Sequence, residues 1–107
     1  MTLNEYQHLA ARTMNRDLSA VSITLHALHG MSAEIGEIHS IYQKAYQGHE
    51  ISMDDMEKEL GDLLWFVAEF CTAQGWFMDD VCRGNIEKLK RRYPDGFSEE
   101  RSVHRTE

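Results

Sequence analysis

A single proline, Pro94, occurs in this chain of 107 residues, and only seven glycines accompany it. Val, Ile and Thr are sparse, so the chain lacks the turn signals and strand formers that a sheet of short strands requires. Apolar residues instead recur at steps of three and four, as on one face of a helix. We therefore expect an all-α, four-helix bundle-like subunit. Its helices are predicted over about residues 3–16, 22–46, 53–74 and 78–92.

Capping residues support most of these boundaries. Thr2 and Glu5 form a T-x-x-E capping box ahead of the first helix. Ser52 is a typical N-cap for the third helix, and Gly75 is a typical residue after its end. The fourth helix has no Ser, Thr or Asn cap at Phe77, so its start is the least defined boundary.

Size and composition bound the class of protein. A mass of 12.4 kDa suits one domain, predicted over residues 1–97, with a polar tail over 98–107. The net charge of −7 argues against general nucleic-acid binding. No apolar run approaches the length of a membrane span, so we expect no membrane partner and a cytoplasmic location. Two cysteines, Cys71 and Cys82, are expected to be reduced.

Residues 63–71, LLWFVAEFC, are apolar nearly all round rather than along one stripe. A small four-helix monomer would have difficulty covering such a helix. A central core helix is one interpretation. The favoured interpretation is a helix shared with another subunit.

Two tetrapeptides carry the chemistry that the residues suggest. Each places two acids three residues apart and a glycine between them, and 25 residues separate the two motifs at both acids: Glu34, Glu37, Glu59 and Asp62. Spacing of three puts each pair on one helix face, and two antiparallel helices can bring the pairs opposite each other. By helical phase, Glu34 falls among the inward apolar residues and Glu59 borders them.

Inward carboxylates that face each other repel, so the arrangement needs cations. Hard oxygen ligands favour Mg²⁺, with Mn²⁺ as a substitute, over zinc. Gly36 and Gly61 each cost about 1 kcal/mol relative to alanine inside a helix. They are expected to permit close helix approach or access of a ligand beside the acids. Glu57 and Glu69 are interpreted as ordinary solvated residues.

Basic and amide side chains lie at steps of three or four on the fourth helix. This face suits phosphate groups in an otherwise acidic chain, and it comprises Asn85, Lys88, Arg91 and Arg92, with Lys44 as a possible addition. An ordinary basic C-terminal turn is the alternative for Arg91 and Arg92.

Histidines give weaker signals. The Glu-x-x-His motif of di-iron bundles occurs once, at Glu5 and His8, where two copies are needed. His26 and His29 are interpreted as a surface or packing pair.

Taken in order, four segments resemble the MazG-like branch of the all-α nucleoside triphosphate pyrophosphohydrolases. They are AEIGE (33–37), ELGDLLWF (59–66), NIEKL (85–89) and RYPDGF (92–97). The resemblance covers almost the whole chain, including Tyr6-Gln7 and Arg12-Thr13. Phe77 departs from it, because relatives tend to have a Ser or Thr helix cap there.

The resemblance implies Mg²⁺-dependent hydrolysis of a nucleoside triphosphate to the monophosphate and pyrophosphate, by a dimer or a tetramer made of two dimers. A nucleoside diphosphate or alarmone hydrolase remains an alternative enzyme. A non-enzymatic helical interaction module, whose acids bind a structural ion, is the alternative of another class.

For a pyrophosphohydrolase, each group of residues has an expected role. The four acids would hold the ions, and Glu34 or Glu37 would take the proton of the attacking water. Lys88 with Arg91 or Arg92 would brace the pyrophosphate, and Asn85 would touch phosphate or sugar. Base selection is the least defined: Gln7, Trp65 and Phe66 are candidates, although aromatic residues at helical spacing are more often core.

Overall fold

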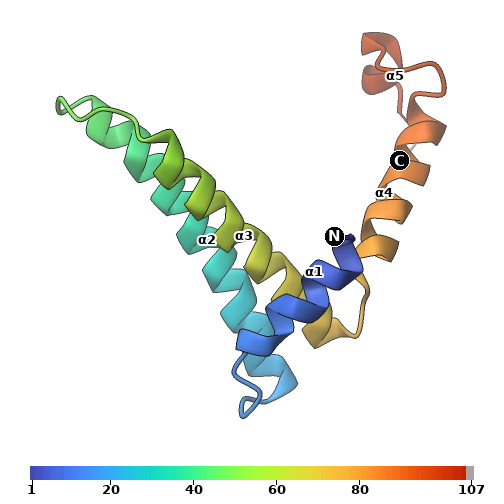
Figure 1. Ribbon diagram of the computed structural model, residues 1–107. Helices are drawn as coiled ribbons and strands as arrows, with labels where there is room; N and C mark the ends of the chain where they lie inside the picture. The colour runs from blue at the N-terminus through green and yellow to red at the C-terminus, as the bar shows by residue number, and fades with distance from the viewer. Residues whose placement is uncertain (106–107) are drawn as a thin grey trace.

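The computed structural model describes residues 1–105, and these residues are helical with no strand among them. An isolated bridge joins Pro94 and Gly96. The predicted all-α class is therefore confirmed. The helices are α1 (Leu3–Ala10), η1 (Ala11–Thr13), α2 (Ala20–Ala45), α3 (Met53–Gln74), α4 (Met78–Arg92) and α5 (Glu99–Val103), shown in Figure 1.

Most predicted boundaries agree with the structure. Thr2 and Glu5 form the expected capping box, and the Ser52 side chain accepts from the Asp55 N–H at the start of α3. Gly75 adopts the left-handed conformation, with a φ of 74°, after α3. The first helix is shorter than predicted, because the chain tightens into η1 after Ala10.

An unpredicted helix, α5, lies in the segment expected to be a polar tail. Ser98 caps it, since the Ser98 side chain accepts from the Arg101 N–H. A five-residue helix carries too little periodicity to be recognised from sequence.

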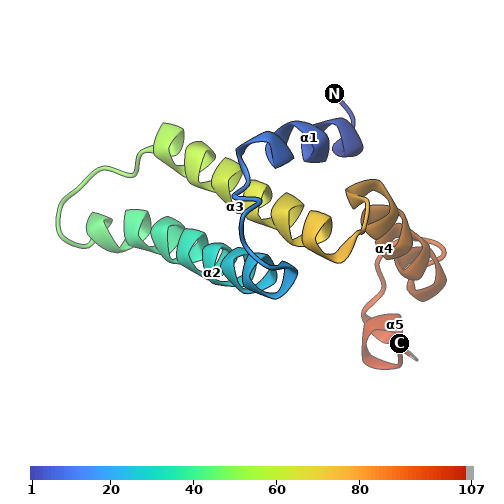
Figure 2. The same ribbon diagram turned by 90° about the horizontal axis from the view of Figure 1, so that it is seen from below.

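The helices form a V rather than a closed bundle. Helices α2 and α3 pack side by side as a hairpin, and α1 lies against α3 (Figures 1 and 2). Helix α4 contacts mainly α1 and points away from the hairpin, so that α4 and α5 form the second arm of the V (Figure 1). The expected four-helix bundle is therefore not closed within one chain.

Side chains of α1 cap α4 and thereby replace the missing cap at Phe77. The Gln7 side-chain oxygen accepts from the Met78 N–H at 2.7 Å, and the Asn4 oxygen accepts from the Asp79 N–H at 3.0 Å. The Gln7 amide nitrogen also donates to the Trp76 carbonyl at 2.8 Å. Two of the N–H groups that a helix start leaves unpaired are thus satisfied by another helix.

Replacing Gln7 with alanine is expected to lower the free energy of unfolding by about 2 to 3 kcal/mol, because the buried Met78 N–H loses its acceptor. Chemical denaturation monitored by circular dichroism measures this. His8→Ala is the matched control on the exposed face of α1. Equal stability of Gln7→Ala and the control would contradict the capping role.

The interior of the single chain is small. Its buried cluster consists of Ala10, Ala68, Cys71 and Met78, and no large side chain among residues 1–105 is fully buried. The accessible surface is 8106 Å², whereas a compact monomer of this mass exposes about 6,100 Å². The radius of gyration is 17.3 Å, against about 13 Å for a compact chain of this length. One chain therefore exposes more surface, and is less compact, than a closed monomer of its mass would be.

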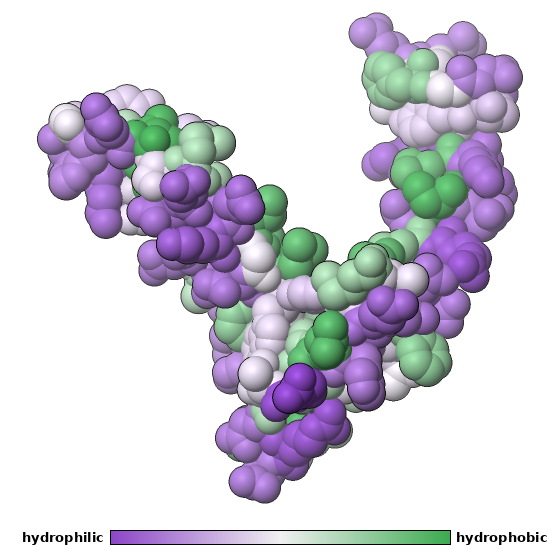
Figure 3. Space-filling view, in the orientation of Figure 1, coloured by the Kyte–Doolittle hydropathy of each residue, from purple (hydrophilic) through white to green (hydrophobic). Residues whose placement is uncertain are grey.

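Apolar surface is visible along the inner side of the V (Figure 3). Within residues 63–71, Ala68 and Cys71 are buried by the chain itself, while Leu64 is 47% exposed. Among residues 1–105, no helix is both long enough and apolar enough to cross a bilayer.

Close approach of the two hairpin helices occurs at Gly30 and not at the glycines of the acidic motifs. A Cβ on Gly30 would lie 2.2 Å from the Phe66 ring, so any larger residue would displace that ring. Gly36 and Gly61 have no atom within 4 Å of such a Cβ. Close approach is therefore the wrong explanation for these two glycines within the described chain, and the space beside them is open.

Candidate functional site

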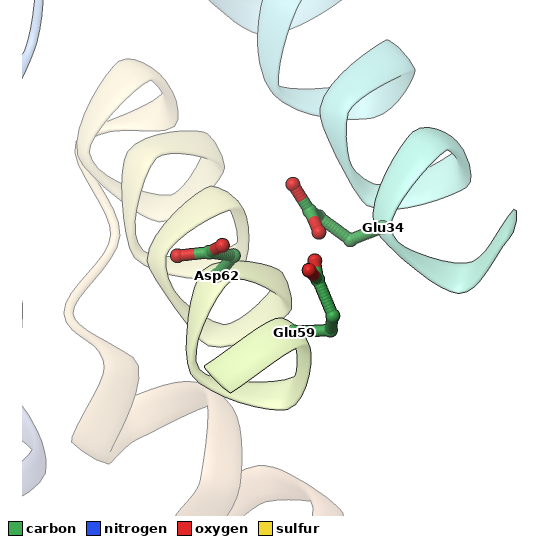
Figure 4. Close-up of side chains that lie close together, drawn as sticks. All are labelled: Glu34, Glu59 and Asp62. Atoms are coloured by element: carbon green, nitrogen blue, oxygen red, sulfur yellow. The ribbon is translucent and has the colours of Figure 1, made fainter. Parts of the chain in front are cut away.

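Three of the four predicted acids converge between the helices of the hairpin. Glu34 comes from the middle of α2, and Glu59 and Asp62 come from one turn of α3 (Figure 4). One carboxylate oxygen from each of the three lies within 4.8 Å of the others. The antiparallel packing of α2 and α3 brings them together, as the 25-residue spacing predicts.

Glu34 is the most perturbed of the three acids. Its Oε2 is buried, and among the described residues it has no hydrogen-bond partner. The adjacent Glu59 carboxyl, burial, and the charges of Asp62 and Glu37 together raise the pKa of Glu34 to about 7. A buried oxygen without a partner, beside two further carboxylates, fits a hard divalent cation, which would replace the proton.

Glu37 does not join the three-residue cluster. It is exposed one turn further along α2, and its charge contributes to the raised pKa of Glu34. Its predicted role as a ligand stays a prediction.

Tyr6 is a neighbour of the site that the residue patterns did not single out as functional. Burial and the charge of Asp62 raise the pKa of the Tyr6 phenol. Its side chain packs against the buried cluster, and the effect of the Asp62 charge on its pKa indicates that the phenol lies near the acidic site.

Metal-free protein should lose stability as the pH rises. The Glu34 pKa lies above its ordinary value of 4.5, so the stabilisation by the proton is complete below pH 4.5 and is lost as the pH rises through about 7. Added Mg²⁺ should therefore raise the melting temperature strongly at pH 8 and little at pH 5. At about 100 times its Kd, an ion adds ~2.7 kcal/mol.

Thermal denaturation with and without Mg²⁺ at the two pH values measures this effect. Glu34→Gln should melt higher than the unmodified chain at pH 8 without metal, and it should respond little to Mg²⁺. Glu57→Gln, on an exposed part of α3, is the control. An equal Mg²⁺ response at pH 5 and pH 8 would refute the coupling.

The predicted phosphate-binding residues lie on other parts of the fold. Asn85 is exposed and Lys88 half-buried on α4, in the arm that stands away from the hairpin (Figure 1). Lys44 lies ten residues beyond Glu34 on α2, which is about 15 Å along the helix. The structure does not bring Lys44 to the carboxylates of its own chain.

Gln7 and Trp65, the candidates for base selection, make structural contacts. Gln7 is buried. Its side-chain amide nitrogen donates hydrogen bonds to the Thr72 hydroxyl and the Trp76 carbonyl, and its side-chain oxygen accepts from the Met78 N–H. The Trp65 indole N–H donates to the Ala10 carbonyl at 3.1 Å and to the Thr13 hydroxyl at 2.8 Å. The predicted base contact by Gln7 stays a prediction, and its side-chain amide already makes these internal hydrogen bonds. The Trp65 ring packs on the buried cluster.

Arg91 and Arg92 are the last two residues of α4. Both line a hollow that α5 completes. Their contact with substrate stays a prediction.

Glu69 corrects the interpretation of this acid as a solvated residue. Its side chain is 3% exposed, and its Oε1 lies 2.6 Å from His26 Nδ1 on α2. His26 also packs its ring against Phe66, with the centroids 5.6 Å apart. The position of Glu69 within an otherwise apolar run was the signal that it is buried. The pair joins the two helices, and His26 is not merely a surface residue.

Comparison with known proteins adds an independent finding. A family model described as the MazG nucleotide pyrophosphohydrolase domain matches residues 24–97. "Gene 37 protein" of Mycobacterium phage L5 is 29% identical over an alignment of 72 residues, and the match covers 63% of this chain and 63% of that protein. The chain thus spans less than two thirds of this relative. No solved structure matches the chain significantly. Since the matched region holds both acidic motifs and most of the described fold, the chain belongs to the MazG nucleotide pyrophosphohydrolase family.

Proposed function

We propose that this protein hydrolyses nucleoside triphosphates to the monophosphate and pyrophosphate, by attack of water at the α-phosphorus. The observation that carries the proposal is the cluster of Glu34, Glu59 and Asp62, in which a buried Glu34 oxygen lacks a hydrogen-bond partner within residues 1–105. The MazG family match supports the same class of reaction.

Glu34, Glu59 and Asp62 are the residues that would hold the ion, and Glu37 is a further ligand in this proposal. A bound Mg²⁺ or Mn²⁺ would neutralise the triphosphate charge and lower the pKa of the attacking water. Glu34 is the proposed proton acceptor, because it lies in the carboxylate cluster that would hold the ion and the attacking water. Glu37 is the alternative acceptor.

Asn85 and Lys88 are the proposed contacts of the triphosphate. They lie on α4, whose main partner is α1 rather than the hairpin, so they stand apart from the carboxylates of their own chain. We therefore infer that a dimer or a tetramer made of two dimers brings this basic face to the carboxylates of a second copy. The excess of accessible surface over that of a compact monomer supports self-association.

A panel of nucleotides tests the function. The protein is incubated with nucleoside triphosphates, nucleoside diphosphates and a guanosine alarmone in Mg²⁺ or Mn²⁺, and the products are separated by ion exchange. Monophosphate plus pyrophosphate from a triphosphate is the expected result. Turnover of diphosphates or the alarmone alone would replace the proposal by that activity. Absence of any turnover would instead favour a non-enzymatic helical interaction module.

Lys88→Ala should lower kcat/KM for the triphosphate by about 10- to 100-fold, because a charge-assisted hydrogen bond to phosphate is lost. Mg²⁺ binding without nucleotide, measured by calorimetry, should stay unchanged. Lys58→Ala removes the same charge from an exposed position of α3 and is the control. An unchanged kcat/KM in Lys88→Ala would show that Lys88 does not contact the phosphate and is an ordinary residue near the helix end.

A further inference from the structure

Three contacts follow one another along the seam between α2 and α3, the two helices of the hairpin (Figure 1). In order, they pair Glu34 with Glu59, Gly30 with Phe66, and His26 with Glu69. The first pair belongs to the proposed ion site, and the other two play no part in it. The seam thus presents carboxylates, then an aromatic ring, and then an imidazole.

His26 lies on the same side of this seam as the acids. His26 precedes Glu37 by about three turns of α2, so both residues project from one face of that helix. Asp62 and Glu69 are about two turns apart on α3 and also share a face. His26 is about 12 Å from Glu34 along the axis of α2. A ligand held at the carboxylates can therefore extend along the seam towards His26.

Glu69 fixes the orientation of the His26 ring. Glu69 is buried, and its Oε1 lies 2.6 Å from His26 Nδ1. A carboxylate offers only acceptors, so Nδ1 carries the hydrogen, and in the neutral ring Nε2 is left as an acceptor. The His26 side chain is 51% exposed, and its ring packs on Phe66 with the centroids 5.6 Å apart. The imidazole is thus held at one nitrogen while much of the side chain faces solvent.

A buried carboxylate is a costly way to join two helices. Apolar side chains of similar volume often join them equally well, and Glu69 interrupts an apolar run that could supply one. Setting the tautomer of an exposed imidazole, in contrast, requires a hydrogen-bond partner at the other ring nitrogen. The orientation of His26 therefore explains the buried acid better than a structural link does.

We propose that His26 contacts the nucleobase of the substrate and favours cytosine and adenine, which carry an amino group where uracil and hypoxanthine carry a carbonyl. Nε2 of His26 accepts a hydrogen bond from this amino group, and the half-buried Phe66 ring offers apolar surface to the base. Carboxylates, ring and imidazole follow the order of phosphate and base in a nucleotide. The inference rests on the proposed function, which places the triphosphate at the carboxylates. Glu69 is a positioning residue, because it acts through His26.

Two pairs of substrates test the proposal. Cytidine and uridine triphosphates differ in the amino or carbonyl group of the base, and adenosine and inosine triphosphates form the matching purine pair. Steady-state kinetics in Mg²⁺ gives kcat/KM for each nucleotide. The amino-bearing member should be favoured about tenfold, because the carbonyl cannot donate to Nε2 and leaves it unpaired.

Substitutions at the pair should change this preference. His26→Ala should reduce it to near unity, and Glu69→Gln should lower it without lowering kcat/KM for the carbonyl-bearing nucleotides. A glutamine amide offers a donor as well as an acceptor, so it no longer selects one tautomer of the ring. His29→Ala removes an exposed histidine of the same helix and should keep the preference.

Circular dichroism checks the helical content of each variant. The combined change of His26→Leu and Glu69→Leu serves if His26→Ala fails to fold, because apolar residues that replace a buried ion pair are often neutral or stabilising. This double variant should also lose the preference.

Binding of uncleavable nucleotides separates this proposal from the proposed hydrolysis. Calorimetry with the α,β-methylene analogues of cytidine and uridine triphosphates in Mg²⁺ should show the same preference without turnover. A preference that His26→Ala removes, in a protein that cleaves no triphosphate, would support the base contact and reject the hydrolysis. Turnover without any effect of His26 on base preference would do the reverse.

Several results would overturn the base contact. Equal kcat/KM within both pairs of nucleotides is one, and a preference for the carbonyl-bearing members is another. A preference that survives His26→Ala, or the double leucine variant, would also exclude it. Loss of kcat/KM by the same factor for every nucleotide in His26→Ala would leave the pair as a structural link between α2 and α3. An unchanged preference in Glu69→Gln would overturn the positioning role of Glu69.

Discussion

Replacing Glu59 or Asp62 with alanine is expected to lower Mg²⁺-dependent nucleotide turnover at least about 100-fold, because each change removes a carboxylate from the proposed ion site. The metal-free variants should be as stable as the unmodified chain or more stable. Loss of one acid relieves the repulsion that raises the Glu34 pKa. Steady-state kinetics and thermal denaturation measure the two effects.

Glu57→Ala is the matched control, since Glu57 is an exposed acid on α3 outside the cluster. It should retain near-normal turnover. Near-normal turnover in Glu59→Ala and Asp62→Ala would exclude the cluster as the catalytic centre. Loss of turnover together with loss of helical content would point to a structural role instead.

Sedimentation equilibrium should give a mass at least twice the 12.4 kDa of one chain at micromolar concentration. Besides the large accessible surface, α2 carries an uncovered apolar stripe at heptad spacing, formed by Val21, Leu25, Leu28, Ile35 and Tyr42. Leu28→Asp would place a charge in this stripe and should shift the mass towards one chain, because an unpaired charge is costly to bury.

Val103→Asp is the control, because it introduces the same charge at an exposed apolar residue of α5 outside the stripe. A monodisperse monomer of the unmodified chain would contradict self-association. An unchanged mass in Leu28→Asp, with self-association retained, would move the contact to another surface. Turnover measured on a monomeric Leu28→Asp preparation should be reduced, since the basic face of α4 would lose its partner.

The sequence determined the features that depend on local order along the chain. Capping residues such as Thr2 and Ser52, and the left-handed Gly75, fixed several helix ends because their interactions span only a few residues. The spacing of Glu34, Glu59 and Asp62 predicted their convergence, because a hairpin of two long helices leaves little freedom in register.

Tertiary structure decided the contacts between residues far apart in sequence. Gln7 caps a helix 71 residues away, and Glu69 is buried against His26 across 43 residues. Helical periodicity carries no information on such partners, since it reports only which face of a helix a residue occupies. The departure of α4 from the hairpin and the hollow that α5 completes are likewise set by contacts and turns beyond any one helix. Local sequence pattern thus predicted the long helices and the acidic motifs, whereas packing decided which side chains make internal contacts.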